Sequence, residues 1–222
     1  MEIRTAFHKS LREIQNDVLA MGSMVEKAIS RSIEALKERD LGTAREVITE
    51  DKKVNDMRYT IEEKCVQLIA TQQPMAGDLR AIICVLHIIT EIERIGDHAE
   101  GIAKIVVMIG DEPPLKPLID IPRMAEIVKG MLHSSLDALI NRDAEAAKEI
   151  IVEDDEVDDL YDQVFRELLT FMAEDPKTIT RATRLIWVAH NLERSADRVT
   201  NICERVVYLV TGKMEELDIS KY

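Results

Sequence analysis

The sequence has few residues that interrupt helices. Its 222 residues include only 8 glycines and 6 prolines, and aromatic side chains make up 4% of the chain. Alanine and aliphatic residues supply most of the apolar fraction. Because these residues lose little conformational entropy in a helix, whereas glycine and proline are unfavourable there, the composition favours an all-helical protein.

Cysteines are scarce as well. The three that occur, Cys65, Cys84 and Cys203, lie far apart and show no CxxC spacing. An odd number at this spacing indicates neither a disulfide framework nor a thiolate zinc site. We expect them to be small buried hydrophobic side chains in a reducing cytosol.

Long apolar runs are missing. The longest mostly apolar stretch, Ala81 to Ile89, is much shorter than the roughly 20 residues of a membrane-spanning helix. The first residues, Met1 to Arg4, lack the apolar core of a signal peptide. We therefore expect a soluble, cytoplasmic protein without direct membrane insertion.

The chain also lacks basic residues relative to acidic ones, and its net charge is −13 with a pI near 4.9. Such a chain is repelled by the phosphates of nucleic acids and by anionic lipid headgroups. Neither is an expected partner. Cations and basic protein surfaces are better candidates.

What the sequence does contain is an internal duplication. Residues 35–56 match residues 138–159 at 11 of 22 positions, with an offset of 103. Residues 92–110 match residues 192–210 at 6 of 19 positions, with an offset of 100. The offset changes in the turn at 73–77, where a difference in length is tolerated.

Each copy is predicted to form three helices, because apolar residues recur at helical spacing and Asp40 and Asp143 stand where N-caps are expected. The expected helices span about 7–37, 40–70, 78–109, 123–141, 144–172 and 177–211. Short connections between long helices imply antiparallel packing. The fold class is therefore all-α, with two tandem three-helix bundles similar to spectrin repeats. The expected divisions are 1–112 for the first bundle, 113–122 for a proline-rich linker, 123–213 for the second bundle and 214–222 for a tail.

Acidic residues stand on the apolar faces of these helices. Asp51 lies between Val47 and Val54 on one stripe, and its counterpart Asp154 has Asp158 one turn further on. In the third helix of each copy the same face carries an i, i+4 pair of acids, namely Glu93 with Asp97 and Glu193 with Asp197. Like charges at this spacing destabilise a helix, and burying an unpaired charge costs several kcal/mol.

A compensating cation is therefore expected in both copies. Facing helices that each offer carboxylates form an oxygen cage suited to Mg²⁺, Ca²⁺, Mn²⁺ or iron. The alternative is internal pairing with Arg94, Arg194 and Arg198. We expect His98 and His190 to be surface or core histidines rather than ligands, and Trp187, Phe165 and Phe171 to belong to the core. No motif for nucleotide binding or for a common hydrolase is present, so an enzyme is not expected.

The same residues carry a family resemblance. Residues 92–99 (IERIGDHA) and 192–198 (LERSADR), followed by Asn201 and Ile202, resemble the paired signatures of the PhoU family, and residues 50–55 and 78–80 fit as well. The resemblance covers essentially the whole chain. It implies two three-helix bundles whose acidic motifs hold multinuclear metal clusters. The implied metal ligands are Asp51, Asn55, Glu93 and Asp97 in the first copy and Asp154, Asp158, Glu193, Asp197 and Asn201 in the second.

The resemblance also implies a function. The protein is expected to be a regulatory adaptor that negatively regulates high-affinity phosphate uptake, as a homodimer acting with the phosphate ABC transporter ATPase and a membrane sensor histidine kinase. The implied cofactors are divalent or trivalent metal ions on oxygen ligands, iron first, with Zn, Mn, Mg or Ca as alternatives. Because Asn55 replaces an acid and Gly101 stands opposite Asn201, the first site is expected to bind metal more weakly. The competing hypothesis is a carboxylate-bundle metal-storage or redox protein, and a purely mechanical helical spacer is disfavoured.

Overall fold

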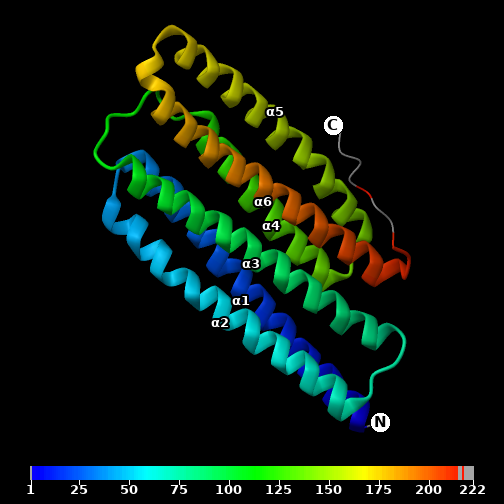
Figure 1. The fold of residues 1–222 in the computed structure, drawn as a ribbon. Coiled ribbons are helices and arrows are strands. Elements are labelled where there is room, and N and C mark those ends of the chain that lie inside the picture. Colours follow the sequence, from blue (N-terminus) through cyan, green and yellow to red (C-terminus); the bar gives the residue numbers. More distant parts are fainter. Residues whose placement is uncertain (1, 215–216, 218–222) are drawn as a thin grey trace.

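The computed structural model describes residues 2–214 and 217, with side chains from residue 6 onward. Six long helices and one short 3₁₀ turn follow each other along the chain (Figure 1). They are α1 (Glu2–Glu38), α2 (Leu41–Gln72), α3 (Gly77–Ile109), α4 (Asp120–Asn141), α5 (Ala144–Glu174), η1 (Pro176–Thr178) and α6 (Ile179–Thr211). The described residues contain no strand. The predicted all-α fold with three helices per copy is confirmed.

The predicted start signals act as N-caps. The Asp40 carboxylate accepts hydrogen bonds from the backbone N–H groups of Gly42 and Thr43, at 2.9 and 3.0 Å. Asp143 caps α5 in the same way, through the backbone N–H groups of Glu145 and Ala146. Each cap satisfies amide groups that have no partner within the helix, which fixes both second helices at matching positions in the two copies.

The fourth helix begins three residues earlier than the sequence suggested. It starts at Asp120, so the last residues of the expected 113–122 linker are helical and Pro122 lies in the first turn of α4. Proline is tolerated there because the first N–H groups of a helix have no partner within it. A proline therefore does not by itself mark the end of a linker.

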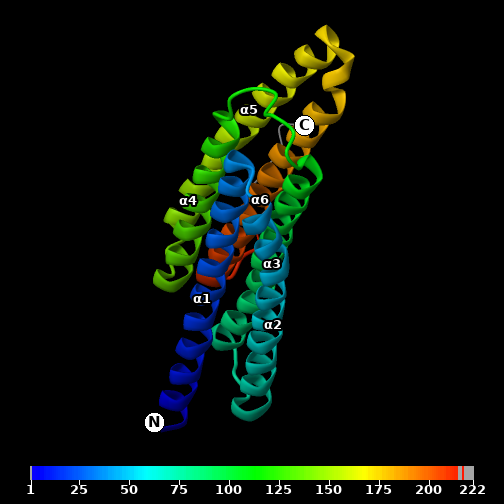
Figure 2. The ribbon, with the colours of Figure 1, turned by 90° about the vertical axis from the view of Figure 1, so that its left-hand side faces the viewer.

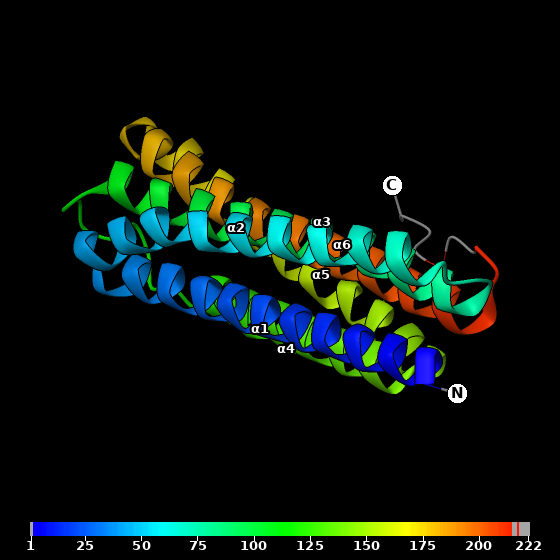
Figure 3. The same cartoon turned by 90° about the horizontal axis from the view of Figure 1, so that it is seen from below.

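The helices form one elongated molecule with two related halves. The α2–α3 turn lies at one end and the α5–α6 turn at the other (Figure 1). Within each half every helix contacts the other two, and the halves meet where α3 packs on α6 and α1 on α4. Figures 2 and 3 show α1 and α4 side by side along the molecule. Buried residues from both halves make a single continuous hydrophobic core.

One contact joins the two halves closely, and another fixes the connection between them. A Cβ atom added to Gly22 of α1 would lie 2.2 Å from Leu136 Cδ1 of α4, so a larger residue would force the Leu136 side chain to shift. In the connection, the buried Lys116 forms ion pairs with Glu167 of α5 and, at 3.6 Å, with Asp120 of α4. The segment between the copies is therefore held against the second half.

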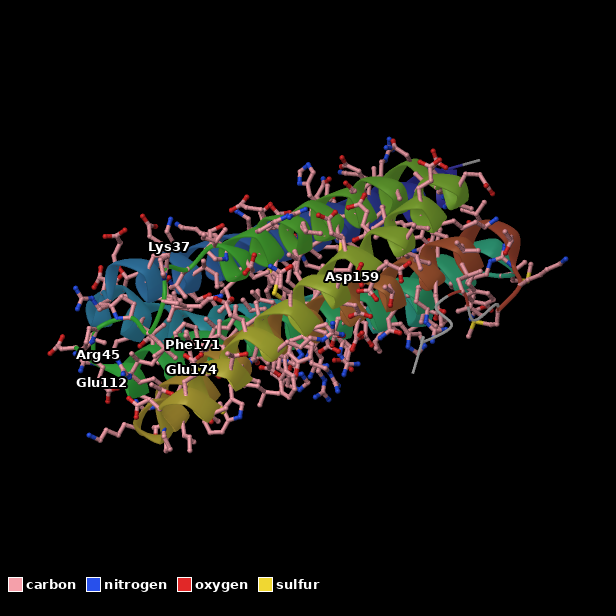
Figure 4. The ribbon with its side chains drawn as sticks, turned by 90° about the horizontal axis from the view of Figure 1, so that it is seen from above. Lys37, Arg45, Glu112, Asp159, Phe171 and Glu174 are labelled. Atoms are coloured by element: carbon pink, nitrogen blue, oxygen red, sulfur yellow. The ribbon has the colours of Figure 1, made fainter. Side chains whose placement is uncertain are left out.

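The aromatic side chains depart from expectation. Trp187 is 49% exposed and Phe165 is 37% exposed, so the prediction that they belong to the core is wrong. Phe171, seen with Glu174 towards the far end of α5 in Figure 4, is only partly buried. Helical spacing places these residues on their helices, but the neighbouring helices do not cover them. The three cysteines are buried and free, as expected.

The stretch from Ala81 to Ile89 is buried along most of its length. Ile83, however, is exposed, so α3 is not covered on every side. No helix in the described part of the chain is long and apolar enough to cross a membrane.

Candidate metal sites

The first acidic group lies between α2 and α3. Asp51 comes from α2, and Glu93 and Asp97 come from successive turns of α3. Burial first, and then the negative charges of Glu100, Asp97 and Glu93, together raise the pKa of Asp51 to about 6. The structure therefore brings together the three acids that the sequence singled out in this copy.

The pKa values of the two acids on α3 are raised as well. Burial raises the pKa of Glu93, and the charge of Asp97 adds to the effect. Burial also raises the pKa of Asp97. Asn55 lies one turn beyond Asp51, and its amide donates a hydrogen bond to Asp51 Oδ2 at 3.0 Å. Asn55 thus stabilises one carboxylate of the group without adding a charge.

The second acidic group repeats this arrangement between α5 and α6. Asp154 is 7% exposed, although it is a charged residue. Burial first, and then the charges of Asp197 and Asp158, together raise the pKa of Glu193 to about 7. Acids of the two facing helices therefore act on each other in this copy as well. Figure 4 labels Asp159 of α5, the exposed neighbour of Asp158.

One oxygen of this group lacks a hydrogen-bond donor. Glu193 Oε2 is buried, and no described residue donates a hydrogen bond to it, although His190 Nδ1 lies 3.2 Å away. A buried carboxylate oxygen without a donor is costly, because it has given up its water and received nothing in return. It is the kind of atom that a cation would satisfy.

Arginines compensate the acids only in part. Arg58 Nε lies 3.9 Å from Glu93 Oε1 in the first copy, and Arg194 Nε lies 3.7 Å from Asp197 Oδ2 in the second. Arg198 pairs instead with Glu91, at 3.4 Å. Internal pairing of Arg194 therefore occurs as the alternative hypothesis anticipated, whereas Arg198 is directed elsewhere.

Asn201 does not join the acidic group in this conformation. Its amide donates a hydrogen bond to Glu91 Oε2 across the seam between α3 and α6, at 3.4 Å. A second contact across the seam joins His98 Nδ1 of α3 to Asn191 Oδ1 of α6, at 3.2 Å. With the offset of 100, His98 corresponds to Arg198 and Asn191 to Glu91, so the duplication relates this contact to the ion pair between Arg198 and Glu91. Burial lowers the pKa of His98 to about 4, so this histidine is a neutral partner in the seam.

Three residues near the sites were not singled out as candidates from the sequence. Glu100 raises the pKa of Asp51 more than any other charge does, and it lies one turn beyond Asp97 on the same helix, so helical spacing was a sufficient signal. Tyr161 and His190 lie beside Glu193, and burial and the charge of Glu193 together raise the pKa of Tyr161. Nothing in a single helix indicates that these two residues meet, because they come from α5 and α6.

The acidic side chains are suitable ligands for a cation, but their present positions do not form a complete binding site. Among the described residues, no three histidine, cysteine or acidic side chains converge closely enough to form a ready-made metal site. The carboxylates lie on facing helices, however, and burial, together with neighbouring negative charge, raises their pKa values, so a hard cation bound there would stabilise them. Binding would require side-chain rotation, with the helices already in place.

Comparison with known proteins agrees with this architecture. The PhoU domain matches the chain twice, over residues 18–106 and 121–206. A curated protein from Clostridium acetobutylicum, named a phosphate-specific transport system accessory protein PhoU homolog, is 41% identical over 216 residues, covering 97% of this chain and 99% of the relative. The crystal structure of PhoU from Pseudomonas aeruginosa matches with a TM-score of 0.88 and 36% identity, over 93% of this chain and 100% of that one. The phosphate transport system regulatory protein PhoU from Streptococcus pneumoniae matches with a TM-score of 0.89 and 30% identity, over 95% of this chain and 99% of that one.

Proposed function

Since the chain belongs to the PhoU family, we propose that it is a regulatory accessory protein of a phosphate-specific transport system. The observation that carries this proposal is the match of the family domain to both copies, together with relatives of nearly equal length that bear accessory and regulatory names. The role is regulatory rather than enzymatic.

The finer proposal concerns partners and direction. The protein restrains high-affinity phosphate uptake by contacting the transporter ATPase and a membrane sensor histidine kinase in the cytoplasm, as a homodimer. Its net charge of −13 supports contact with basic protein surfaces, because opposite charges speed association and align the partners.

The two acidic groups are proposed to bind metal ions. Asp51, Glu93, Asp97 and Asn55 would hold a cation in the first copy, and Asp154, Asp158, Glu193 and Asp197 would do so in the second. The buried Glu193 Oε2 without a hydrogen-bond donor supports this assignment. A bound cation supplies positive charge that links facing helices, so that metal binding stiffens each half for docking. Iron is the first candidate, with Zn, Mn, Mg and Ca as alternatives.

Two measurements test the proposed function. In a host that lacks its own PhoU protein, this chain is expected to restore repression of a phosphate-starvation reporter when phosphate is abundant. Purified protein is expected to bind the transporter ATPase subunit and the cytoplasmic part of the kinase. Failure of both restoration and binding would overturn the regulatory role.

A ferroxidase assay distinguishes the proposed adaptor from the competing storage or redox protein. An adaptor is expected to oxidise iron(II) no faster than the metal-loaded buffer does. Turnover above that background would favour the redox protein instead.

A further inference from the structure

The two acidic sites differ at several aligned positions, and at two of these the difference brings new ligand chemistry next to the acids. With the offset of 103, Arg58 of α2 corresponds to Tyr161 of α5. With the offset of 100, Thr90 of α3 corresponds to His190 of α6. Three of the surrounding acids are repeated, as Asp154, Glu193 and Asp197 in the second copy. Beside them, these two positions place a cation and a hydroxyl in the first copy, and a phenol and an imidazole in the second.

In the first copy, Arg58 fills the position next to the acids. Its side chain is 22% exposed, and its guanidinium lies 3.9 Å from Glu93 and 3.6 Å from Glu62. It also lies over the ring of Tyr59, with 4.7 Å between Cζ and the ring centroid. A fixed positive charge therefore already offsets part of the negative charge at this site, and any metal ion must compete with it.

In the second copy the two corresponding positions carry potential metal ligands. The rings of Tyr161 and His190 lie 6.0 Å apart between their centroids. The Nδ1 atom of His190 is 3.2 Å from Glu193 Oε2, the buried oxygen that accepts no hydrogen bond. The His190 side chain is 50% exposed, so it is free to turn towards a bound ion without unpacking the core.

We propose that the second site is a mixed nitrogen–oxygen site for a transition-metal ion, completed by Tyr161 and His190, whereas the first site is an oxygen-only site weakened by Arg58. The inference rests on the proposed metal-binding function and adds the ligand class. Imidazole selects zinc, copper, iron or nickel over magnesium and calcium, and a phenolate is a strong ligand of iron(III). Phenolate coordination requires only that the phenol release its proton to solvent as the metal–oxygen bond forms.

The test uses the full chain stripped with a chelator and then titrated with zinc(II), magnesium(II) or iron(III), the last added as a weak chelate. Wild-type protein is expected to develop the visible absorption of an iron(III)–phenolate, and Tyr161→Phe is expected to lose it. His190→Gln is expected to weaken zinc binding tenfold or more, on the order of the effects seen around metal ligands, and to leave magnesium binding unchanged.

Matched controls lie in the first copy. Tyr59→Phe and His87→Gln alter an exposed tyrosine of α2 and an exposed histidine of α3, and they are expected to behave as wild type. Arg58→Tyr provides an independent test, because it should create a second phenol-bearing site and increase the iron(III) absorption about twofold, by analogy with one phenolate per site. Helix content measured by circular dichroism shows that each variant is folded.

The outcomes separate the two proposals. If wild-type protein binds metal but Tyr161→Phe keeps the full absorption and His190→Gln binds zinc as wild type does, the ligand assignment is overturned and the metal-binding function stands. If wild-type protein binds no more metal than a variant that carries Asp51→Asn, Glu193→Gln and Asp197→Asn, both proposals fail.

Discussion

Replacing Asp51 with asparagine should stabilise the metal-free protein. The carboxylate is partly buried among Glu93, Asp97 and Glu100, and its pKa rises from 3.8 to about 6 in the folded state. The folded protein therefore holds this proton more tightly than the unfolded chain does. Stability from this group is fully present below about pH 4, falls as the pH rises to about 6, and stays reduced at higher pH.

The size of the effect follows from the shift. About two pH units correspond to about 3 kcal/mol. Water screens a carboxylate that is only partly buried, so we expect Asp51→Asn to raise the free energy of unfolding by about 2 kcal/mol at pH 8 and by roughly nothing at pH 3.5. The variant keeps a side-chain oxygen as an acceptor for the Asn55 amide, which donates to Asp51 in the wild type.

The assay is urea unfolding followed by circular dichroism, in chelator, at both pH values. Glu50→Gln is the matched control on the same helix. Hydrogen bonds from Lys53 and Arg31 lower the pKa of Glu50, so its neutralisation should not stabilise the protein and should cost up to about 1 kcal/mol at pH 8. Equal stabilities of Asp51→Asn and wild type at pH 8 in chelator would refute the electrostatic reasoning.

The remaining predictions concern the helix crossing between the halves and the connection that joins them. Gly22→Ala should lower the free energy of unfolding by about 1 kcal/mol, because the crowding of Leu136 exceeds the gain in helix propensity. Gly130 has open space around it, so Gly130→Ala should raise the free energy of unfolding by about 0.5–1 kcal/mol. Equal effects of the two substitutions in urea unfolding would contradict the close helix crossing. Lys116→Met should lower the free energy of unfolding by about 1–2 kcal/mol, because Glu167 is left without its buried partner. This loss should lower the Tm by about 3–6 °C. An unchanged Tm would show that this ion pair does not hold the connection.

The sequence predicted the architecture well because its signals are local. Helical periodicity gave the six helices, Asp40 and Asp143 marked two starts by side-chain capping, and the repeat fixed the number of copies. The start of α4 was placed late because Pro122 was taken as a residue outside the helix. Proline excludes a helix interior but not its first turn.

The parts that the sequence did not predict depend on how helices pack. Trp187 is exposed because none of the described helices covers its face of α6, and periodicity alone does not show this. The partner of Arg198 is Glu91, on a helix that lies about a hundred residues earlier in the chain. Likewise, Tyr161 and His190 meet only because α5 and α6 pack side by side. The acids themselves were predictable, since each stands on an apolar stripe.

The central claim is that crowded acids between paired helices hold metal ions. Elemental analysis of protein purified without chelator and without nickel affinity resin tests it most directly. We expect at least about one metal ion per chain in the wild type, and a clear loss in a variant that carries Asp51→Asn, Glu193→Gln and Asp197→Asn but retains its helix content. Wild-type protein with no metal above the buffer blank, or a variant with the same metal content as wild type, would contradict the claim.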